Sequence, residues 1–176
     1  MQYTMHYDSP LGGILLAGDE EGLTGLWFDG AKYERAGLDP ACKEGDLPVL
    51  RETKRWLDHY FSGREPDFMP PLHMTGTSFQ QAVWAQLRKI PYGTTVTYGA
   101  LAAALEAQGR GPVSAQAVGG AVGHNRISIL VPCHRVVGAG GSLTGYAGGL
   151  EKKRKLLALE GADLSRLSAP RRGSAL

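Results

Sequence analysis

A reactive cysteine is indicated by the run Ile129-Leu130-Val131-Pro132-Cys133-His134-Arg135-Val136-Val137. Cys133 is followed by His134, a base near neutral pH, and by Arg135, a permanent cation. The thiolate is the nucleophilic form of cysteine, and nearby positive charge favours it. The same residues also fit a structural interpretation, because free cysteines are commonly buried, inert side chains. Neighbours on a strand also point to opposite faces, so adjacency alone does not bring His134 to the thiol.

Polar and glycine-rich motifs lie on both sides of this run. Asn125 precedes Cys133, and a tyrosine lies further upstream in Thr97-Tyr98-Gly99. A glycine-rich segment, Gly141-Ser142-Leu143-Thr144-Gly145-Tyr146-Ala147-Gly148-Gly149, follows the cysteine. The segment Leu156-Leu157-Ala158-Leu159-Glu160-Gly161 comes next. A nucleophilic thiol needs a base with an orienting group behind it. Glu160 can supply that group, although a solvent-exposed glutamate is the commoner arrangement.

Together these motifs resemble the O6-alkylguanine-DNA alkyltransferases, the methylated-DNA–protein-cysteine methyltransferases. The resemblance runs from about Thr77 to Gly161, roughly half of the chain, and is carried by Pro-Cys-His-Arg-Val, the glycine-rich loop and Leu-Leu-x-Leu-Glu-Gly. It implies DNA repair by direct damage reversal. The O6-alkyl group of a flipped-out guanine moves irreversibly to the protein's own cysteine, so each molecule repairs one lesion. Transfer from O4-alkylthymine remains open, and the resemblance implies no cofactor.

The resemblance also implies a role for each motif residue. Cys133 is the acceptor, His134 the base that acts through a bound water, and Glu160 the group that orients it. Asn125 braces the turn before the active-site run, and Tyr98 contacts the target nucleotide and assists the leaving base. The residues implied to contact substrate or DNA are Tyr98, Gln116, Arg135, Val136, Tyr146 and Ala147.

One position departs from the family pattern. Gln116 stands where the family usually carries an arginine that fills the gap left by the flipped base. The turn before it, about Glu106 to Val113, is also longer than usual, and Arg110 in that turn is a possible substitute. Glutamine lacks the charge and the planar stacking surface of arginine. The hypothesis is that base flipping or duplex affinity is weakened while the chemistry at Cys133 survives.

The strand-like and helical segments that must position these residues predict an α+β fold. Residues 2–7, 13–18 and 23–28 are short, apolar or β-branched segments separated by turns, which indicates a small antiparallel sheet. A helix is expected from Pro48 until Gly63, since its apolar residues recur at helical spacing. We expect residues 31–47 to form a loop. The predicted N-terminal subdomain is 1–70, followed by a linker at 71–76.

The predicted second domain, residues 77–165, is mainly helical. A capping box at Ser78-x-x-Gln81 opens its first helix. Two further helices, 97–107 and 112–123, are expected, with Pro112 at the first position of the latter. Such a pair across a glycine-containing turn indicates a helix-turn-helix. The small side chains of the second helix fit either close packing or close approach to DNA, and the family places this helix in the minor groove. Residues 166–176 are expected to be a disordered basic tail.

The charge is unevenly distributed along the chain. Residues 1–70 contain 7 basic and 13 acidic residues, a net of −6, and the remainder contains 12 and 4, a net of +8, which together give +2. This asymmetry predicts that the C-terminal half meets a polyanion, here double-stranded DNA carrying O6-alkylguanine. The alternative is that Lys152, Lys153, Arg154 and Lys155 are the solvated face of a helix.

Cysteine content and hydropathy bear on disulfides, cellular location and metal binding. Cys42 and Cys133 do not make a disulfide framework, and the chain shows neither a signal peptide nor a membrane-spanning stretch. These features predict a cytoplasmic protein with no membrane partner. We also expect the protein to be a monomer. Some relatives hold zinc near the N-terminus, but only Cys42 is present there, so no metal is expected.

Two other function classes were weighed against alkyl transfer. A non-catalytic binder of alkylated DNA would need no nucleophile, and such relatives lack the cysteine. A cysteine hydrolase or thiol redox enzyme would use Cys133 and His134. The chain has no second cysteine nearby for redox chemistry and no evident oxyanion motif.

Overall fold

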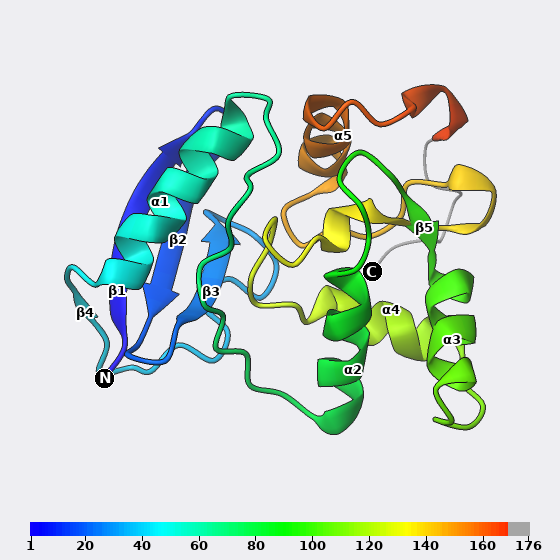
Figure 1. The fold of residues 1–176 in the computed structure, drawn as a ribbon, viewed down its shortest axis with the longest axis horizontal. Helices are drawn as coiled ribbons and strands as arrows, with labels where there is room; N and C mark the ends of the chain where they lie inside the picture. The colour runs from blue at the N-terminus through cyan, green and yellow to red at the C-terminus, as the bar shows by residue number, and fades with distance from the viewer. Residues whose placement is uncertain (169–176) are drawn as a thin grey trace. The chain divides into compact units, whose positions relative to one another are not determined.

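The computed structural model describes residues 1–168, and its chain divides into two compact units (Figure 1). The first unit contains residues 1–75 together with 126–130. The second contains 76–125 and 131–168. The sequence predicts a similar point of division but not the return of 126–130 to the first unit. No helix among the described residues is long and apolar enough to cross a bilayer.

A four-stranded mixed sheet forms the first unit. Strands β1 (Tyr3–Ser9), β2 (Gly12–Gly18) and β3 (Leu23–Phe28) are antiparallel neighbours, as predicted. Strand β4 (Lys43–Glu44) pairs in parallel with β1, which gives the order β3-β2-β1-β4. The expectation of a purely antiparallel sheet, with a loop at 31–47, is therefore corrected. Two charged residues are too few to carry an alternating pattern that would have revealed this strand.

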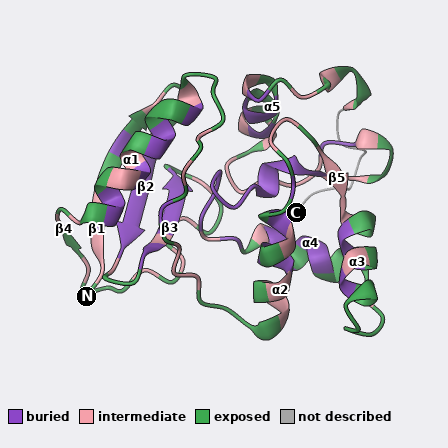
Figure 2. Cartoon of the chain, in the orientation of Figure 1, coloured by how far each residue is buried: buried purple, intermediate pink, exposed green. Residues whose placement is uncertain are grey.

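Helix α1 (Pro48–Phe61) covers the first unit's apolar side. Its buried residues recur at helical spacing and include Leu50, Trp56, Leu57 and Tyr60, and this inward stripe is visible in Figure 2. The helix ends at Ser62, and Gly63 follows with φ 86°, a conformation that glycine adopts without strain.

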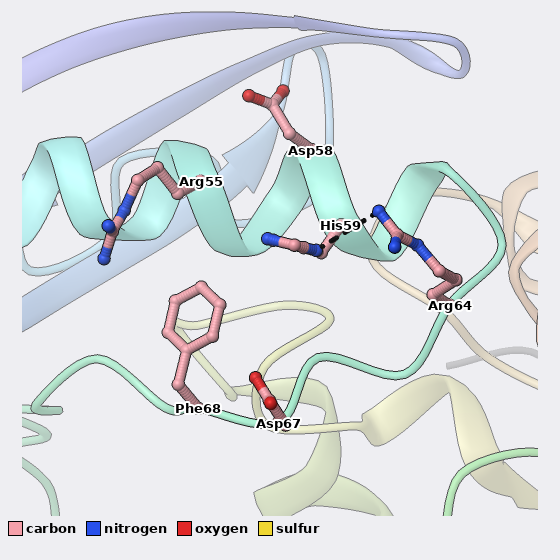
Figure 3. A pocket seen from close by; sticks show the side chains of 6 residues that line it. All are labelled: Arg55, Asp58, His59, Arg64, Asp67 and Phe68. Atoms are coloured by element: carbon pink, nitrogen blue, oxygen red, sulfur yellow. Dashed lines mark hydrogen bonds between the residues drawn. The ribbon is translucent and has the colours of Figure 1, made fainter.

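A shallow hollow lies beside the C-terminal half of α1 (Figure 3). The guanidinium of Arg55 lies 5.5 Å from the ring centroid of Phe68, and the His59 ring meets the same ring edge-on at 5.7 Å. These contacts hold the segment after α1 against the helix. None of the predicted site residues lines this hollow.

The segment predicted as a linker is paired with the sheet. Leu23 N–H donates to the carbonyl of Pro71, and His73 N–H donates to that of Leu23, both over 2.8 Å. His73 Nδ1 lies 2.7 Å from an oxygen of Asp19. Backbone pairing with β3 is a non-local interaction, so the local sequence of residues 71–76 predicted a linker and did not reveal it.

Residues 126–130 extend the pairing of β3. Leu26 N–H donates to the carbonyl of Arg126 over 2.8 Å, and Ser128 N–H returns a bond to Leu26 over 3.1 Å. Ile129 adopts φ 72°, unusual for a β-branched residue.

The second unit is mainly helical. Its elements are α2 (Ser78–Leu87), β5 (Val96–Thr97), α3 (Tyr98–Ala107), α4 (Ala115–Gly123), the short 3₁₀ helix η1 (Cys133–Arg135), β6 (Val136–Val137), η2 (Ala139–Gly141), α5 (Leu150–Leu159) and η3 (Leu164–Arg166). Strands β5 and β6 are parallel partners. Trp84 on α2 is buried and donates its indole N–H to the carbonyl of Ala121 on α4 over 2.9 Å. This bond ties α2 to α4.

Two helix starts differ from their predicted positions. The capping box of α2 is Thr77 with Gln80, one residue earlier than predicted, because overlapping Ser/Thr-x-x-Gln patterns occur there. Helix α4 begins at Ala115 rather than Pro112, since the hydroxyl of Ser114 accepts from Ala117 N–H and caps the helix. The long turn before it is held by Glu106, whose carboxylate accepts from Val113 N–H over 2.8 Å.

The described chain continues beyond the predicted end of the second domain. Arg166 lies in η3, and Ser168 forms a β-bridge with Ser142. The first three residues of the expected disordered tail are therefore structured. Residues 169–176 lie outside the described part of the chain.

Candidate active site

Cys133 occupies the first position of η1, where the apolar run ends. The residue is only 6% exposed, and its N–H donates to the carbonyl of Val131 over 2.8 Å. A 3₁₀ turn brings consecutive side chains to different sides of a tight helix rather than to opposite faces of a sheet. The opposite-face rule of a strand thus does not apply here, and His134 and Arg135 are both buried.

A buried carboxylate links the two residues after the cysteine. His134 Nε2 lies 2.6 Å from Glu160 Oε2, with both side chains fully enclosed. Arg135 meets the same carboxylate with two nitrogens, Nε to Oε1 at 2.8 Å and Nη2 to Oε2 at 3.1 Å. Such a two-point contact fixes the carboxylate in its plane. The structure thus brings together His134 and Glu160, as the sequence predicts.

Glu160 is fixed from the helix side as well. It lies at the C-cap of α5, and Gly93 N–H donates to its Oε1 over 3.1 Å. Gly93 has φ 76°, and a Cβ there would stand 2.9 Å from the Glu160 carbonyl oxygen. A glycine is therefore required at position 93 by both conformation and space.

Burial and charge act in opposite directions on the ionisable groups here. Burial raises the pKa of Cys133, while a hydrogen bond from Asn125 and the charge of Lys153 lower it in part. Burial lowers the pKa of His134 and outweighs the opposite influence of Glu160. Burial also disfavours ionised Glu160, but His134 and Arg135 outweigh it and hold the pKa of that carboxyl far below its usual value. The resting site accordingly contains a neutral imidazole beside a carboxylate.

The second ring nitrogen of His134 can serve a reacting partner. Nε2 is engaged by Glu160, whereas the buried Nδ1 has no hydrogen-bond partner among the described residues. If Nε2 carries the ring proton toward the carboxylate, Nδ1 becomes the basic atom. This arrangement has the form of a base held by an acid in the correct tautomer.

Asn125 and Tyr98 adjoin the cysteine from other elements. Asn125 follows α4, and its Nδ2 donates to the carbonyl of Val131 over 2.9 Å, which holds the run leading to Cys133. Tyr98, the first residue of α3, donates its hydroxyl to the carbonyl of Thr144 over 3.3 Å. Burial raises the pKa of Tyr98, so its phenol keeps its proton at neutral pH.

The remaining predicted residues fall into two groups. Tyr146 is half-buried, its ring edge-on to His134 at 6.5 Å, and Ala147 follows it in the same loop. Val136 is buried in β6 opposite Val96. Gln116 is different, because it lies exposed on the first turn of α4.

The structure places Arg135, which was predicted to contact substrate or DNA, within the buried site. Its side chain is 10% exposed, and its guanidinium is committed to Glu160 and to the carbonyl of Ile90, 2.8 Å from Nη1. The same group lies over the ring of Tyr92 at 5.6 Å. These contacts leave the guanidinium a part of the buried site rather than of the surface.

Lys153 is a site residue that the sequence did not reveal. The sequence offered two interpretations of the lysine-rich stretch on α5, contact with a polyanion or a solvated helix face, yet Lys153 is completely buried and fits neither. Its Nζ donates to the carbonyls of Thr144 over 2.6 Å and Gly145 over 3.1 Å. Helical spacing offered one signal, because Lys153 is three residues before the buried Leu156 and so shares its face.

The described residues offer no ready metal site. Within residues 1–168, no group of three or more histidine, cysteine, aspartate or glutamate side chains could hold a metal ion.

Fold and site together define a class of protein, one in which a buried cysteine is followed directly by a histidine that is hydrogen-bonded to a buried carboxylate. Family models identify that class more closely. The DNA binding domain of 6-O-methylguanine DNA methyltransferase matches residues 78–162, and the ribonuclease-like domain of the same family matches residues 2–74. The two matches follow one another along the chain and together include every predicted site residue.

Individual relatives agree with the family models. The methylated-DNA–protein-cysteine methyltransferase of Haemophilus influenzae is 43% identical over 90% of this chain and 86% of its own. That of Methanosarcina acetivorans is 45% identical over 91% and 99%. The crystal structure of Mycobacterium tuberculosis OGT in complex with DNA superposes with a TM-score of 0.77 at 42% identity, covering 96% of this chain and 94% of the other. The chain belongs to the methylated-DNA–protein-cysteine methyltransferase family, and its function is direct-reversal DNA repair.

Proposed function

We propose that Cys133 is the acceptor of an alkyl group from O6 of guanine in DNA. The thiol first loses its proton, and the thiolate then attacks the alkyl carbon in line with the carbon–O6 bond. A carbon–sulfur bond forms, the carbon–oxygen bond breaks, and guanine leaves with the electron pair and regains a proton. Since the thioether product is stable, one protein molecule repairs one lesion.

The observation that carries this proposal is the buried 2.6 Å contact between His134 and Glu160, directly after the cysteine. It supports His134 as the group that takes the thiol proton, because the imidazole is neutral and its Nδ1 has no partner among the described residues. By family resemblance a bound water connects the two. Glu160 then stabilises the imidazolium that forms.

The leaving base needs a hydrogen-bond donor as its oxygen gains charge. Tyr98 can supply one without adding charge, since its phenol stays protonated and its present acceptor, the Thr144 carbonyl, is 3.3 Å away. By resemblance, the carbonyl of Val136 and the N–H of Ala147 contact the purine edge. The half-buried ring of Tyr146 adjoins His134, which suits it to stack on a flipped base.

We assign DNA contact to the exposed face of α4. Ala115, Gln116, Ala117 and Gly120 are all exposed, and a Cβ added at Gly120 would meet no atom within 4 Å. The minor groove is only about 6 Å wide, so a helix with small side chains suits it better than an ordinary one. Because all the proposed catalytic residues come from one chain, the protein can act on alkylated duplex as a monomer.

A labelled-duplex experiment tests the proposal. Protein is incubated with a duplex whose O6-methylguanine carries a radiolabelled methyl group, and label on protein and DNA is followed. Wild type should take up one methyl per molecule, Cys133→Ala none, and the control Cys42→Ala the wild-type amount. Binding without transfer by wild type would instead favour a non-catalytic binder of alkylated DNA. Catalytic release of a labelled product would favour a hydrolase.

A further inference from the structure

The 91–94 turn, Pro91-Tyr92-Gly93-Thr94, lies between α2 and β5. Thr94 closes it twice, since its N–H donates to the carbonyl of Pro91 over 3.2 Å and its hydroxyl donates to the same oxygen over 2.7 Å. Gly93 is the third residue and has φ 76°, which is the conformation that a type II turn requires at this position. The turn is therefore defined by its own sequence.

The 91–94 turn and the residue before it contact both members of a buried ion pair. Gly93 N–H donates to Glu160 Oε1 over 3.1 Å. The carbonyl of Ile90 accepts from Arg135 Nη1 over 2.8 Å. The ring of Tyr92 lies under the same guanidinium, 5.6 Å from its carbon to the ring centroid. One short segment thus holds the arginine and the carboxylate that it pairs with.

The donors around Glu160 are distributed over its two oxygens. Oε1 accepts from Gly93 N–H and from Arg135 Nε, whereas Oε2 accepts from Arg135 Nη2 and faces His134 Nε2 at 2.6 Å. These donors hold the pKa of the carboxyl far below its usual value, so Glu160 has no proton to give. The hydrogen atom in the short contact therefore belongs to His134 Nε2, and Nδ1 is left as the basic nitrogen.

We propose that the 91–94 turn is a positioning element for the alkyl transfer, and that Gly93 N–H fixes Glu160 so that His134 keeps its ring proton on Nε2. The inference rests on the proposed role of His134 as the base and deepens it. Gly93 acts through Glu160, so it is a positioning residue rather than a catalytic one. Without this contact, one oxygen of the carboxylate loses a donor, and the bond that orients and charges the imidazole weakens.

A side chain at position 93 separates the turn from the carboxylate. A Cβ there would stand 2.9 Å from the Glu160 carbonyl oxygen, a backbone atom at the end of α5. Gly93→Ala must therefore move the turn, and its N–H, away from Oε1. Gly63→Ala is the matched control, since Gly63 has φ 86° and an added Cβ would meet no atom within 4 Å. The control introduces a similar backbone strain without a contact to the site.

Three measurements against pH test the proposal. The first two are methyl transfer from saturating O6-methylguanine duplex and alkylation of Cys133 by iodoacetamide, the latter in a Cys42→Ala background. The third is NMR of the imidazole nitrogens of His134, assigned by their loss in His134→Gln, which reports the protonated nitrogen and the titration midpoint. The charged or ionisable groups of the same unit that act on this imidazole or adjoin it are Cys133, Arg135, Tyr146, Lys153 and Glu160.

The expected result is a change in the state of His134 as well as in rate. Wild type should carry the neutral ring's proton on Nε2, and Gly93→Ala should show a mixture of the two tautomers. Its midpoint should also fall by about one unit, because Glu160 favours the charged imidazole, and its base strength then falls about tenfold. Both reactions should be about tenfold slower near neutral pH. The deficit should shrink as rising pH ionises the thiol directly, and Gly63→Ala should match wild type.

The outcomes separate this inference from the proposed function. A rate deficit of Gly93→Ala that is the same at every pH, with the proton of His134 still on Nε2, would give the turn a merely structural role and overturn the proposal. If wild type transferred no methyl group, the proposed function would fail. The NMR comparison of wild type with Gly93→Ala would still decide whether the turn fixes the tautomer.

A second pair of variants covers the case in which Gly93→Ala does not fold. Tyr92→Leu removes the ring under the Arg135 guanidinium, and Tyr92→Phe retains it. A cation–π contact is worth about 0.5–1 kcal/mol at exposed sites, so the leucine variant should react about threefold more slowly than the phenylalanine variant near neutral pH. Its His134 midpoint should also be the lower of the two. Equal midpoints and equal pH profiles for the pair would overturn the role of the turn.

Discussion

At the scale of single residues, Glu160 has to satisfy more partners than an orienting acid usually does. Its two oxygens accept from His134, from Arg135 and from the N–H of Gly93. Arg135 neutralises much of the carboxylate charge, so Glu160 orients the imidazole without making it permanently protonated. A neutral His134 is the form that can accept the thiol proton.

Replacing Gln116 tests the residue at which this chain departs from its family. Gln116→Arg should raise the rate of duplex repair about fivefold, equivalent to about 1 kcal/mol, because a guanidinium can stack in the space left by a flipped base. The measurement is the rate constant for repair of a duplex under single-turnover conditions. Transfer from free O6-benzylguanine is the control and should not change, since Gln116 is exposed on α4 away from the buried cluster's contacts. Equal duplex rates would show that Gln116, or Arg110 nearby, already fulfils this function.

At the scale of elements, local patterns predicted the parts that depend on local interactions. The three antiparallel strands and α1 follow from alternation and helical spacing, and their cores are buried accordingly. The pairing of Pro71 with Leu23, and of Arg126 with Leu26, joins residues remote in sequence and leaves no local signature.

For the site, motif resemblance identified His134 and Glu160 correctly as neighbours. It did not show that Arg135 faces inward or that Lys153 is buried, because both depend on packing.

Helix α4 allows the proposed DNA-binding face to be tested separately from folding. Gly120→Leu should weaken binding to duplex about tenfold, because the added side chain would occupy the space in which a groove must approach. The folded protein should not be destabilised, since the position is open and leucine favours helix over glycine by about 0.5–1 kcal/mol. Fluorescence anisotropy and thermal unfolding are the two measurements. Gly120→Ala is the control and should bind nearly as wild type. Tight binding by the leucine variant would exclude this face as the contact.

At the scale of the whole molecule, the exposed basic residues are distinct from the buried charged residues around Cys133. The first 70 residues have a net charge of −6 and the rest +8, so the attraction to DNA resides in the half that also contains Cys133. Within that half, the charges nearest the cysteine are buried and paired with one another or with carbonyls. The exposed basic residues are others, such as Arg154 and Lys155 on α5 and Arg110 in the turn before α4. Binding and transfer should consequently respond differently to salt.

Salt titration makes that separation measurable. Neutralising phosphates releases counterions, so the affinity for duplex falls with a slope of about −0.9 per contact on a log–log plot. With about two phosphate contacts, raising NaCl from about 50 to about 200 mM should weaken duplex binding about twelvefold. The rate of transfer from free O6-benzylguanine should change less than about twofold, because buried charges are little screened. Equal salt dependence of the two would mean that the charges that attract DNA also control the thiol. In that case, the exposed basic residues of α5 would need to be replaced one by one to find those that act on Cys133.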